Sequence, residues 1–307
     1  MQPFRAILLK IASVTTFLLM SSLIKATSTH VPPGEAVFFR SFFALPVTLI
    51  WLWSRKELRT GLKTSDPMKH VWRGLVGTLA MGLGFTGLGL LPLPEVTAIG
   101  YAAPLLTVIF AAMFLGEQVK LFRLSAVALG LVGVLIVLSP RLEAFSNSSM
   151  HSREALGAVV VLMGAGCAAL AQVFIRKMVF TERTSAIVFY FTLTSTMLSL
   201  LTIPFGWVIP APREAILLIL AGVFGGLGQI LLTSSYRFAD VSVIAPFEYV
   251  SIIFALGIGY FVFNETPTLV MLIGAALVVA AGVLIIWREG KLGLERSKQR
   301  KVMTPHG

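Results

Sequence analysis

EVTAIGYAAPLLTVIFAAMFLGEQV (residues 95–119) and DVSVIAPFEYVSIIFALGIGYFVFNETP (residues 240–267) are stretches of one kind, and together they decide the fold of this chain. Each opens with an acidic residue and a valine, carries a proline inside an apolar run and closes with a glutamate. The matching pairs are Glu95 and Asp240, Pro104 and Pro246, and Glu117 and Glu265. GVLIV (133–137) follows the first stretch and GVLII (282–286) follows the second, so the ordered features indicate an internal repeat.

The composition around these stretches is that of a membrane protein. Of the 307 residues, 56% are hydrophobic and 13% are charged, which lies far outside the range of soluble globular domains. Apolar runs of about 20 residues, enough to cross a hydrocarbon core of roughly 30 Å as a helix, recur along the chain. We predict an all-α integral membrane protein with ten transmembrane helices, at 4–27, 34–54, 72–91, 95–115, 123–139, 155–177, 184–205, 215–235, 242–263 and 269–287.

The repeat divides the ten predicted helices into two halves of five, at residues 4–139 and 155–287. Because five is an odd number, the second half enters the membrane from the opposite side to the first. Such inverted repeats are typical of secondary transporters, which place one site near the middle of the membrane and expose it to each side in turn. The remaining residues, 288–307, are predicted to form a basic cytoplasmic tail.

The net charge of +11 reports orientation in the membrane. If the N-terminus is cytoplasmic, most lysines and arginines, with Lys10 and Arg73 among them, fall at the cytoplasmic side of the predicted helices. By the positive-inside rule, both termini are then cytoplasmic. A nucleic-acid partner is therefore not expected, and the lipid bilayer is the predicted surrounding. The sequence leaves open whether the protein is a monomer or a homodimer.

The residues of three predicted helices resemble the EamA-type transporters of the drug/metabolite transporter superfamily. The resemblance rests on EAVFFRSFFALP (35–46), LPEVTAIGYAAPLLTVIFAAMFLGE (93–117) and ADVSVIAPFEYVSIIFALGIGYFVFNE (239–265). It implies a central cavity surrounded by the first to fourth and sixth to ninth helices, with the fifth and tenth at the periphery. It also implies a small-molecule substrate, movement by alternating access and a location in the bacterial inner membrane.

Two charged residues inside predicted helices are the leading site candidates. Glu248 lies two residues after Pro246, where the missing backbone N–H loosens a helix. It is expected to bind a cationic or hydrogen-bonding substrate group or to exchange a proton, or else to be a structural partner of a lysine or tyrosine. An isolated arginine at a helix centre costs about 2.5 to 3.5 kcal/mol on insertion scales. Arg40 is therefore expected to line the cavity, to extend to the membrane interface or to clamp neighbouring helix ends.

Further polar side chains lie within the predicted helices. Tyr101 lies shortly before Pro104, and Tyr249 lies shortly after Pro246. Gln172 and Gln229 are amides in the sixth and eighth helices. Such groups turn inward, where they hydrogen-bond between helices or contact substrate. The lysines at 10 and 25 are expected to extend toward the two membrane surfaces. The glutamates that end the paired stretches are expected to pair with nearby bases or to cap the next helix.

The same pattern excludes several classes of function. The four histidines lie in predicted loops or the tail, no H-E-x-x-H motif is present and no Walker motif offers ATP hydrolysis. The G-x-G-x-x-G match at 82–87 lies inside an apolar helix and so lacks the strand that a nucleotide fold needs. We therefore expect a transporter without a cofactor or metal, and not an enzyme; a channel or receptor stays open. The resemblance suggests riboflavin uptake, with export of amino acids or drugs as the alternative.

Overall fold

The computed structural model describes residues 3–58, 60–115, 121–147, 152–238, 245–284 and 287, and every regular element in these ranges is a helix. In chain order the elements are α1 (Pro3–Thr27), α2 (Pro33–Phe42), α3 (Ala44–Ser54), α4 (Pro67–Leu90), α5 (Leu93–Gly100), α6 (Ala102–Leu115), α7 (Leu121–Asn147), α8 (Ser152–Met178), α9 (Thr184–Leu200), η1 (Ile203–Phe205), α10 (Pro212–Phe238), η2 (Ala245–Glu248) and α12 (Val250–Phe263). A further helix covers Leu269–Leu284.

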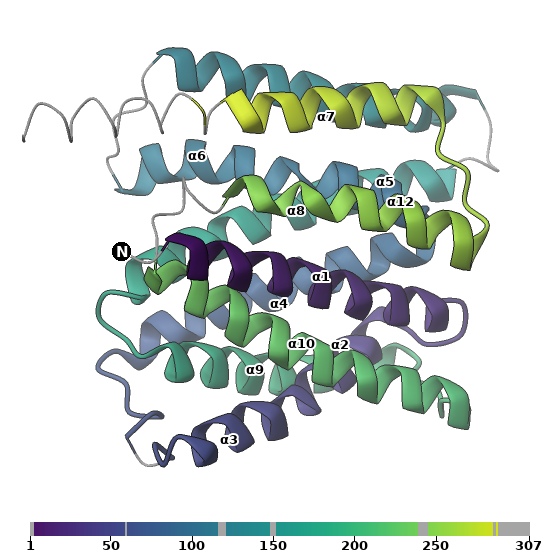
Figure 1. The fold of residues 1–307 in the computed structure, drawn as a ribbon. Coiled ribbons are helices and arrows are strands. Elements are labelled where there is room, and N and C mark those ends of the chain that lie inside the picture. Colours follow the sequence, from purple (N-terminus) through teal and green to yellow (C-terminus); the bar gives the residue numbers. More distant parts are fainter. Residues whose placement is uncertain are drawn as a thin grey trace, which may run out of the picture.

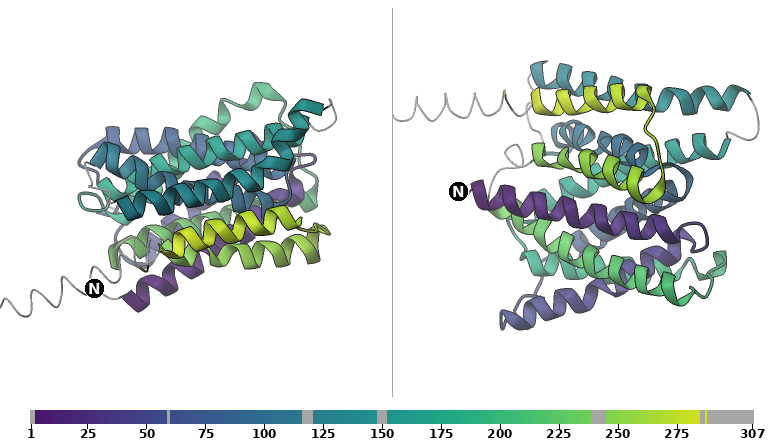
Figure 2. Two further views of the ribbon diagram at one scale, coloured as in Figure 1. Left: turned by 90° about the horizontal axis from the view of Figure 1, so that it is seen from above. Right: turned by 45° about the vertical axis from the view of Figure 1, so that its right-hand side comes forward.

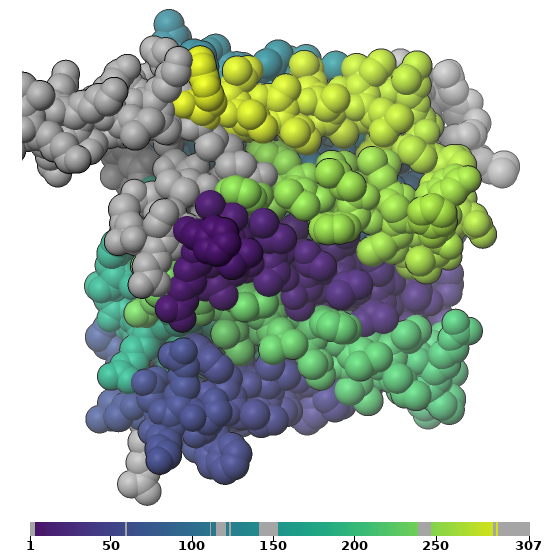
Figure 3. Space-filling model, in the orientation of Figure 1, coloured from purple at the N-terminus to yellow at the C-terminus, as the bar shows by residue number. Residues whose placement is uncertain are grey.

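The helices form one bundle in which they run roughly side by side (Figure 1). On the face drawn in Figure 3, α1 lies between α10 and α12, so the first helix of the chain is packed among helices of the second half. The helix Leu269–Leu284 lies beside α7 at one edge of the bundle in all three ribbon views (Figures 1 and 2). These two helices approach closely at Gly133 and Gly274, where a Cβ on either glycine would come within 2.8 Å of the other's carbonyl oxygen.

Length and composition confirm an all-helical membrane protein. Five helical segments of the described chain are long and apolar enough to cross a membrane, and they cover Phe4–Thr27, Pro33–Ser54, Leu93–Phe114, Arg153–Met178 and Pro212–Phe238. Four shorter apolar helices cover Leu124–Pro140, Thr184–Leu200, Val250–Phe263 and Leu269–Leu284. With α4, these segments overlap all ten predicted positions, and the number of membrane crossings remains a prediction.

Three of the predicted helices are interrupted, and prolines account for two of the breaks. The second predicted helix ends as α2 at Phe42 and resumes as α3 at Ala44, and the fourth ends as α5 at Gly100 and resumes as α6 at Ala102. Pro46 and Pro104 cannot donate a hydrogen bond to the carbonyl four residues earlier, which belongs to Phe42 in one case and Gly100 in the other. The helical ladder therefore stops where those carbonyls lose their partners.

The ninth predicted helix begins irregularly, and the fifth is longer than expected. The 3-10 turn η2 ends at Glu248, and α12 begins after Tyr249, at Val250. The prediction that the fifth helix ends at residue 139 is wrong, because α7 continues through Pro140 to Asn147. An exposed proline at this position costs one backbone hydrogen bond but does not stop the helix.

Candidate functional site

The breaks in the fourth and ninth predicted helices meet inside the bundle. The Tyr101 hydroxyl lies 2.7 Å from Ser251 Oγ, and it also donates to the Tyr249 carbonyl oxygen at 3.4 Å. The rings of Tyr101 and Tyr249 are 5.0 Å apart in an edge-to-face arrangement, and both tyrosines are buried. The fourth and ninth predicted helices therefore touch where each has lost its regular helical structure.

Glu248 stands at this meeting point as one partner of an ion pair. Its Oε2 lies 3.1 Å from Nζ of Lys10 on α1, and the exposed fractions of the two side chains are 27% and 3%. Ser251 Oγ donates to the Glu248 carbonyl oxygen at 2.6 Å, which links the pair to Tyr101. Of the roles expected for Glu248, the structure contains the structural one, a carboxylate partner for a lysine. The expectation that Lys10 extends to the membrane surface is wrong, because its ammonium is buried against this carboxylate.

A second ion pair joins the other end of α1 to the end of α12. Lys25 Nζ lies 2.9 Å from Glu265 Oε1 and donates to the carbonyl oxygens of Leu91 at 2.7 Å and Leu88 at 3.2 Å. The other carboxylate oxygen of Glu265 accepts a hydrogen bond from the Leu93 N–H, at the start of α5. Glu265 thus pairs with a base, as expected, and the helix that it caps is α5 and not the next helix in the chain. The predicted surface position of Lys25 is wrong, and the corresponding Glu117 lies outside the described residues.

Arg40 points into the bundle. Its side chain, 2% exposed, crosses from α2 to α10, where Nη2 donates to the Gly225 carbonyl oxygen at 3.3 Å. Its guanidinium also faces the ring of Phe191 on α9, with 5.5 Å between the guanidinium carbon and the ring centre. The interface position considered for Arg40 is therefore wrong, and it is a buried residue between helices of both halves.

Arg73 shares this environment, although its sequence position assigned it to the cytoplasmic side. It is 4% exposed, and its guanidinium carbon lies 3.8 Å from the centre of the same Phe191 ring. Its burial was not predicted: α4 begins at Pro67, five residues before the predicted start, so Arg73 lies nearly two turns inside the helix. The signal that the sequence offered was an arginine inside the predicted helix 72–91.

The two predicted glutamines make fewer contacts between helices than the charged residues do. Gln229 is buried on α10, one turn after Gly225, and its amide nitrogen lies 3.5 Å from the Thr233 hydroxyl. Gln172 is half-buried on α8. Neither is brought to the contact between Tyr101 and Ser251 by a described hydrogen bond, so their role in substrate contact stays a prediction.

The connection between α3 and α4 is fastened to the loop before α9 by a buried carboxylate. Glu182 Oε1 accepts hydrogen bonds from the Ser65 hydroxyl at 2.7 Å, the Ser65 N–H at 2.9 Å and the Thr64 hydroxyl at 3.0 Å. Burial by itself raises the pKa of Glu182, but these hydrogen bonds from Ser65 and Thr64, with His70 nearby, outweigh it and lower the pKa below its ordinary value. This network fixes the start of α4, and hence the position of Arg73.

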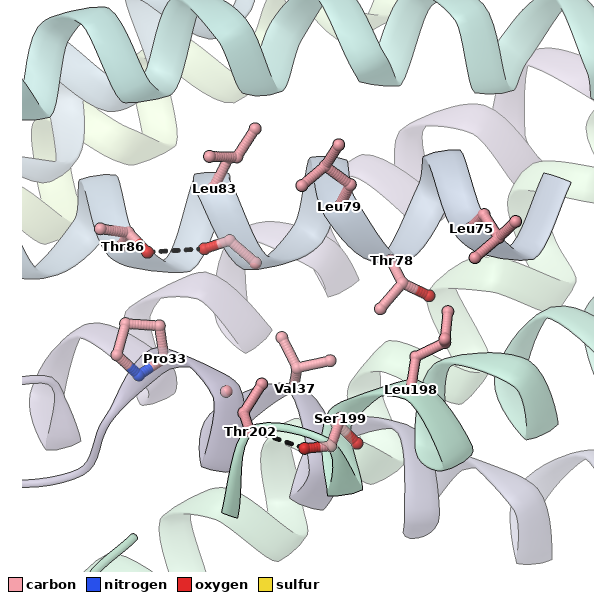
Figure 4. Close-up of a pocket in the computed structure, with 12 residues that line it drawn as sticks. Pro33, Val37, Leu75, Thr78, Leu79, Leu83, Thr86, Leu198, Ser199 and Thr202 are labelled. Carbon is pink, nitrogen blue, oxygen red and sulfur yellow. Dashed lines mark hydrogen bonds between the residues drawn. The ribbon is translucent and has the colours of Figure 1, made fainter. Parts of the chain in front are cut away.

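A pocket of about 350 Å³ lies between α2, α4 and α9 (Figure 4). This volume falls in the range of small-molecule sites. Its walls are Pro33, Gly34, Val37, Leu75, Thr78, Leu79, Gly82, Leu83, Thr86, Leu198, Ser199 and Thr202. They are mostly aliphatic, with hydroxyl groups and no aromatic ring, and they include none of the six predicted site residues.

Comparison with known proteins identifies the family. The sequence profile described as the EamA-like transporter family matches residues 4–139 and 155–287. The chain is 33% identical over 284 residues to the pseudopaline exporter CntI of Pseudomonas aeruginosa, covering 91% of this chain and 93% of the relative. It is 29% identical over 267 residues to the S-adenosylmethionine uptake transporter of Rickettsia bellii, covering 87% and 88%.

Two other comparisons agree with this result. An uncharacterized transporter of Helicobacter pylori (strain J99) is 31% identical over 280 residues, covering 88% of this chain and 90% of the relative. A crystal structure of a protein with 18% sequence identity superposes with a TM-score of 0.67, covering 94% of this chain and 98% of the other. The second likeness supports the fold.

Proposed function

This chain belongs to the EamA-like transporter family, and from that premise we propose that it moves a small metabolite across the bacterial inner membrane by alternating access. The moving units are the two halves, residues 4–139 and 155–287, inserted in opposite orientations with both termini in the cytoplasm. The protein is a membrane transporter and not an enzyme. Transport proceeds by rocking of the halves about the region where Tyr101 and Tyr249 meet.

One observation carries this proposal: the interrupted fourth helix contacts the interrupted ninth helix through Tyr101 and Ser251. In transporters built from inverted repeats, a pair of broken helices in corresponding positions is the best pointer to the binding site. Irregular backbone at membrane depth is tolerated only where protein or a water-filled cavity satisfies it. The substrate path is therefore assigned next to this contact, with Glu248 as the ionisable residue on it.

The ion pairs of α1 fit the same proposal. Lys10 and Lys25 are 15 residues apart on one helix, or about 22 Å along its axis. Their partners, Glu248 and Glu265, lie just before and just after α12. A helix tied to the opposite half at both ends cannot separate from it at either end until one pair breaks. Opening toward one side is then proposed to break one of these pairs while the other holds.

For the substrate we propose two candidates. Riboflavin uptake is suggested by the stretch PPGEAVFFRSFFALP (32–46), while uptake as such is favoured by the relative that is named for S-adenosylmethionine uptake. Export of amino acids or drugs is the second candidate, favoured by the 33% identical relative that is named as an exporter. Because these two relatives are named for opposite directions, both candidates require assays of uptake and of release.

The test uses purified full-length protein in proteoliposomes. Labelled riboflavin, S-adenosylmethionine and amino acids are offered, and saturable entry with counterflow is expected for one of them. The double variant Lys10→Met/Glu248→Gln removes both charges of the buried pair and is expected to abolish transport. Glu214→Gln, which changes a glutamate paired with the exposed His30, is the matched control and is expected to transport normally.

Other results would change the proposal in defined ways. Non-saturable flux without counterflow would replace the carrier by a channel. Normal transport by the double variant would remove Glu248 from the mechanism. Transport of an amino acid or drug, but not riboflavin, would decide between the two candidates.

A further inference from the structure

Two arginines converge on one aromatic ring inside the bundle. Arg40 lies seven residues from the start of α2 and Arg73 six residues from the start of α4, so each is about 10 Å from a helix end. These starts lie at opposite ends of the bundle, because α4 returns antiparallel to the α2 and α3 segment. Both guanidiniums nevertheless face Phe191, at 5.5 and 3.8 Å from the ring centre.

Neither guanidinium is neutralised by the protein around it. Nε and Nη1 of both arginines are buried without a hydrogen-bond partner, and so is the hydroxyl of Ser41, next to Arg40. Within the part of the chain that the structure describes, no carboxylate lies within ion-pair distance of Arg40 or Arg73. The ring of Phe191 attracts both cations but carries no charge. Two unpaired positive charges therefore lie together, away from water, which is strongly unfavourable unless an anion joins them.

Glycines on two helices make room for this arrangement. A Cβ at Gly225 would come within 2.7 Å of Arg40 Nε and 3.0 Å of Met20 Sδ. A Cβ at Gly77 would collide with Arg73 Nη1 and would lie 2.8 Å from Phe191 Cε2. The close approach of Arg40 to α10 and of Arg73 to its own helix, α4, therefore uses the space left by glycines at these positions.

The pocket between α2, α4 and α9 lies along the helices that carry the arginines, although neither arginine is among its lining residues. Val37, on its wall, precedes Arg40 by three residues, and Leu75 follows Arg73 by two. One turn further, the hydroxyl of Thr78 lies 2.7 Å from that of Ser195 on α9. An apolar space therefore begins within about one helical turn of two unneutralised guanidiniums.

We propose that Arg40 and Arg73 form a subsite for the oxyanion group, carboxylate or phosphate, of an organic anion whose apolar part occupies the pocket between α2, α4 and α9. A guanidinium donates strong charge-assisted hydrogen bonds to such groups, and the unpartnered Nε and Nη1 of each arginine are donors open to the oxyanion. The subsite rests on the proposed function and names the substrate class. Riboflavin is uncharged and would leave both arginines unpaired.

The test is calorimetric titration of purified full-length protein in detergent at neutral pH and low salt. Phenylacetate and phenyl phosphate are the anionic probes, and phenylacetamide is the uncharged probe of similar shape. Binding of at least one anion is expected, with at least tenfold weaker binding of the amide. The preferred anion distinguishes a carboxylate ligand from a phosphate ligand.

The variants separate this subsite from general charge effects. Arg40→Met and Arg73→Met are each expected to raise the dissociation constant of the anion at least tenfold. Arg55→Met is the matched control, because Arg55 also lies over an aromatic ring, that of Trp51, but is exposed. This variant is expected to bind the anion with the same dissociation constant as the unmodified protein. Gly77→Ala should weaken binding by displacing Arg73, whereas Gly84→Ala, which meets nothing within 4 Å, should not.

Three results would overturn the proposal: equal binding of amide and anions, unchanged binding in both arginine variants, or binding of neither anion. Because binding is measured in detergent without a membrane gradient, the subsite proposal can fail independently of the transport proposal. Anions that bind through the arginines but are not carried in proteoliposomes would leave the subsite standing and remove the transport proposal. Saturable transport that is unaffected by Arg40→Met and Arg73→Met would leave the transport proposal standing and remove the subsite.

Discussion

Two buried charged regions of this molecule differ in how they are balanced. At the meeting point of the halves, Lys10 lies against Glu248, so the region is neutral in sum. Beside Phe191, Arg40 and Arg73 lie together without a carboxylate among the described residues, so that region carries two positive charges. Buried charge that the protein balances itself holds helices together, whereas buried charge that it leaves unbalanced is available to a ligand. The two regions should therefore respond to mutation with opposite signs.

The largest effect is expected from Glu248→Gln. This change leaves the ammonium of Lys10, only 3% exposed, without a partner, and breaking a buried pair in this way costs about 3 to 5 kcal/mol. Denaturant titration in mixed micelles should give that loss in the free energy of unfolding. Lys10→Met in the same chain should recover most of it, because no uncompensated charge remains. A double variant as unstable as Glu248→Gln would show that the pair is not what stabilises this region.

A smaller loss is expected from Lys25→Met. The ammonium holds Glu265 and two carbonyl oxygens, but the pair is partly exposed, and the carboxylate keeps its hydrogen bond from the Leu93 N–H. We expect a loss of about 1 to 3 kcal/mol in the same titration. Lys69→Met, which breaks an exposed pair with Asp66, is the control and should cost under about 1 kcal/mol. Equal losses in both variants would contradict a role for burial.

The sequence predicted the helices better than the partners of their charges. Span length predicted the positions of the apolar helices, because apolar runs are a local property of the sequence, whereas the breaks in three of them were not predicted. The ion pair of Lys10 joins residues separated by 238 positions, and no local pattern encodes such a contact. The expectation that lysines reach the membrane surface follows from considering one helix alone. The burial of Arg73 was missed because α4 begins five residues earlier than predicted, and errors of a few residues decide whether a charge lies at a helix end or inside the bundle.

A further test concerns the hydrogen bond that links the two breaks. Tyr101→Phe removes the bond to Ser251, which still donates to the Glu248 carbonyl oxygen, so the expected loss is about 1 kcal/mol. Tyr260→Phe, at an exposed tyrosine of α12, should leave the free energy of unfolding unchanged. A loss above about 3 kcal/mol for Tyr101→Phe would mean that the contact between the halves depends on this hydroxyl far more than a single hydrogen bond provides.

The smallest effect on stability, and the one that decides the comparison, is expected from Arg73→Met. Removing one of two like charges relieves their repulsion, and an apolar side chain of similar length fills the space. Without organic anions, the free energy of unfolding should stay unchanged or rise by up to about 1 kcal/mol. A loss of the size expected for Glu248→Gln would mean that the protein balances these arginines itself and would end the distinction between the two regions.

The ion pairs of α1 also have a consequence for biosynthesis. The first helix is made with two lysines whose carboxylate partners are among the last residues to be made, Glu248 and Glu265. At about 5 to 20 residues per second, the ribosome needs roughly 10 to 50 s to cover the 238 positions between Lys10 and Glu248. During that interval both ammonium groups lack their carboxylates, although Lys25 can already donate to the carbonyl oxygens of Leu88 and Leu91. For Lys10 we expect extension toward the membrane surface until the residues around Glu248 have been made, and a move to the buried pair after that.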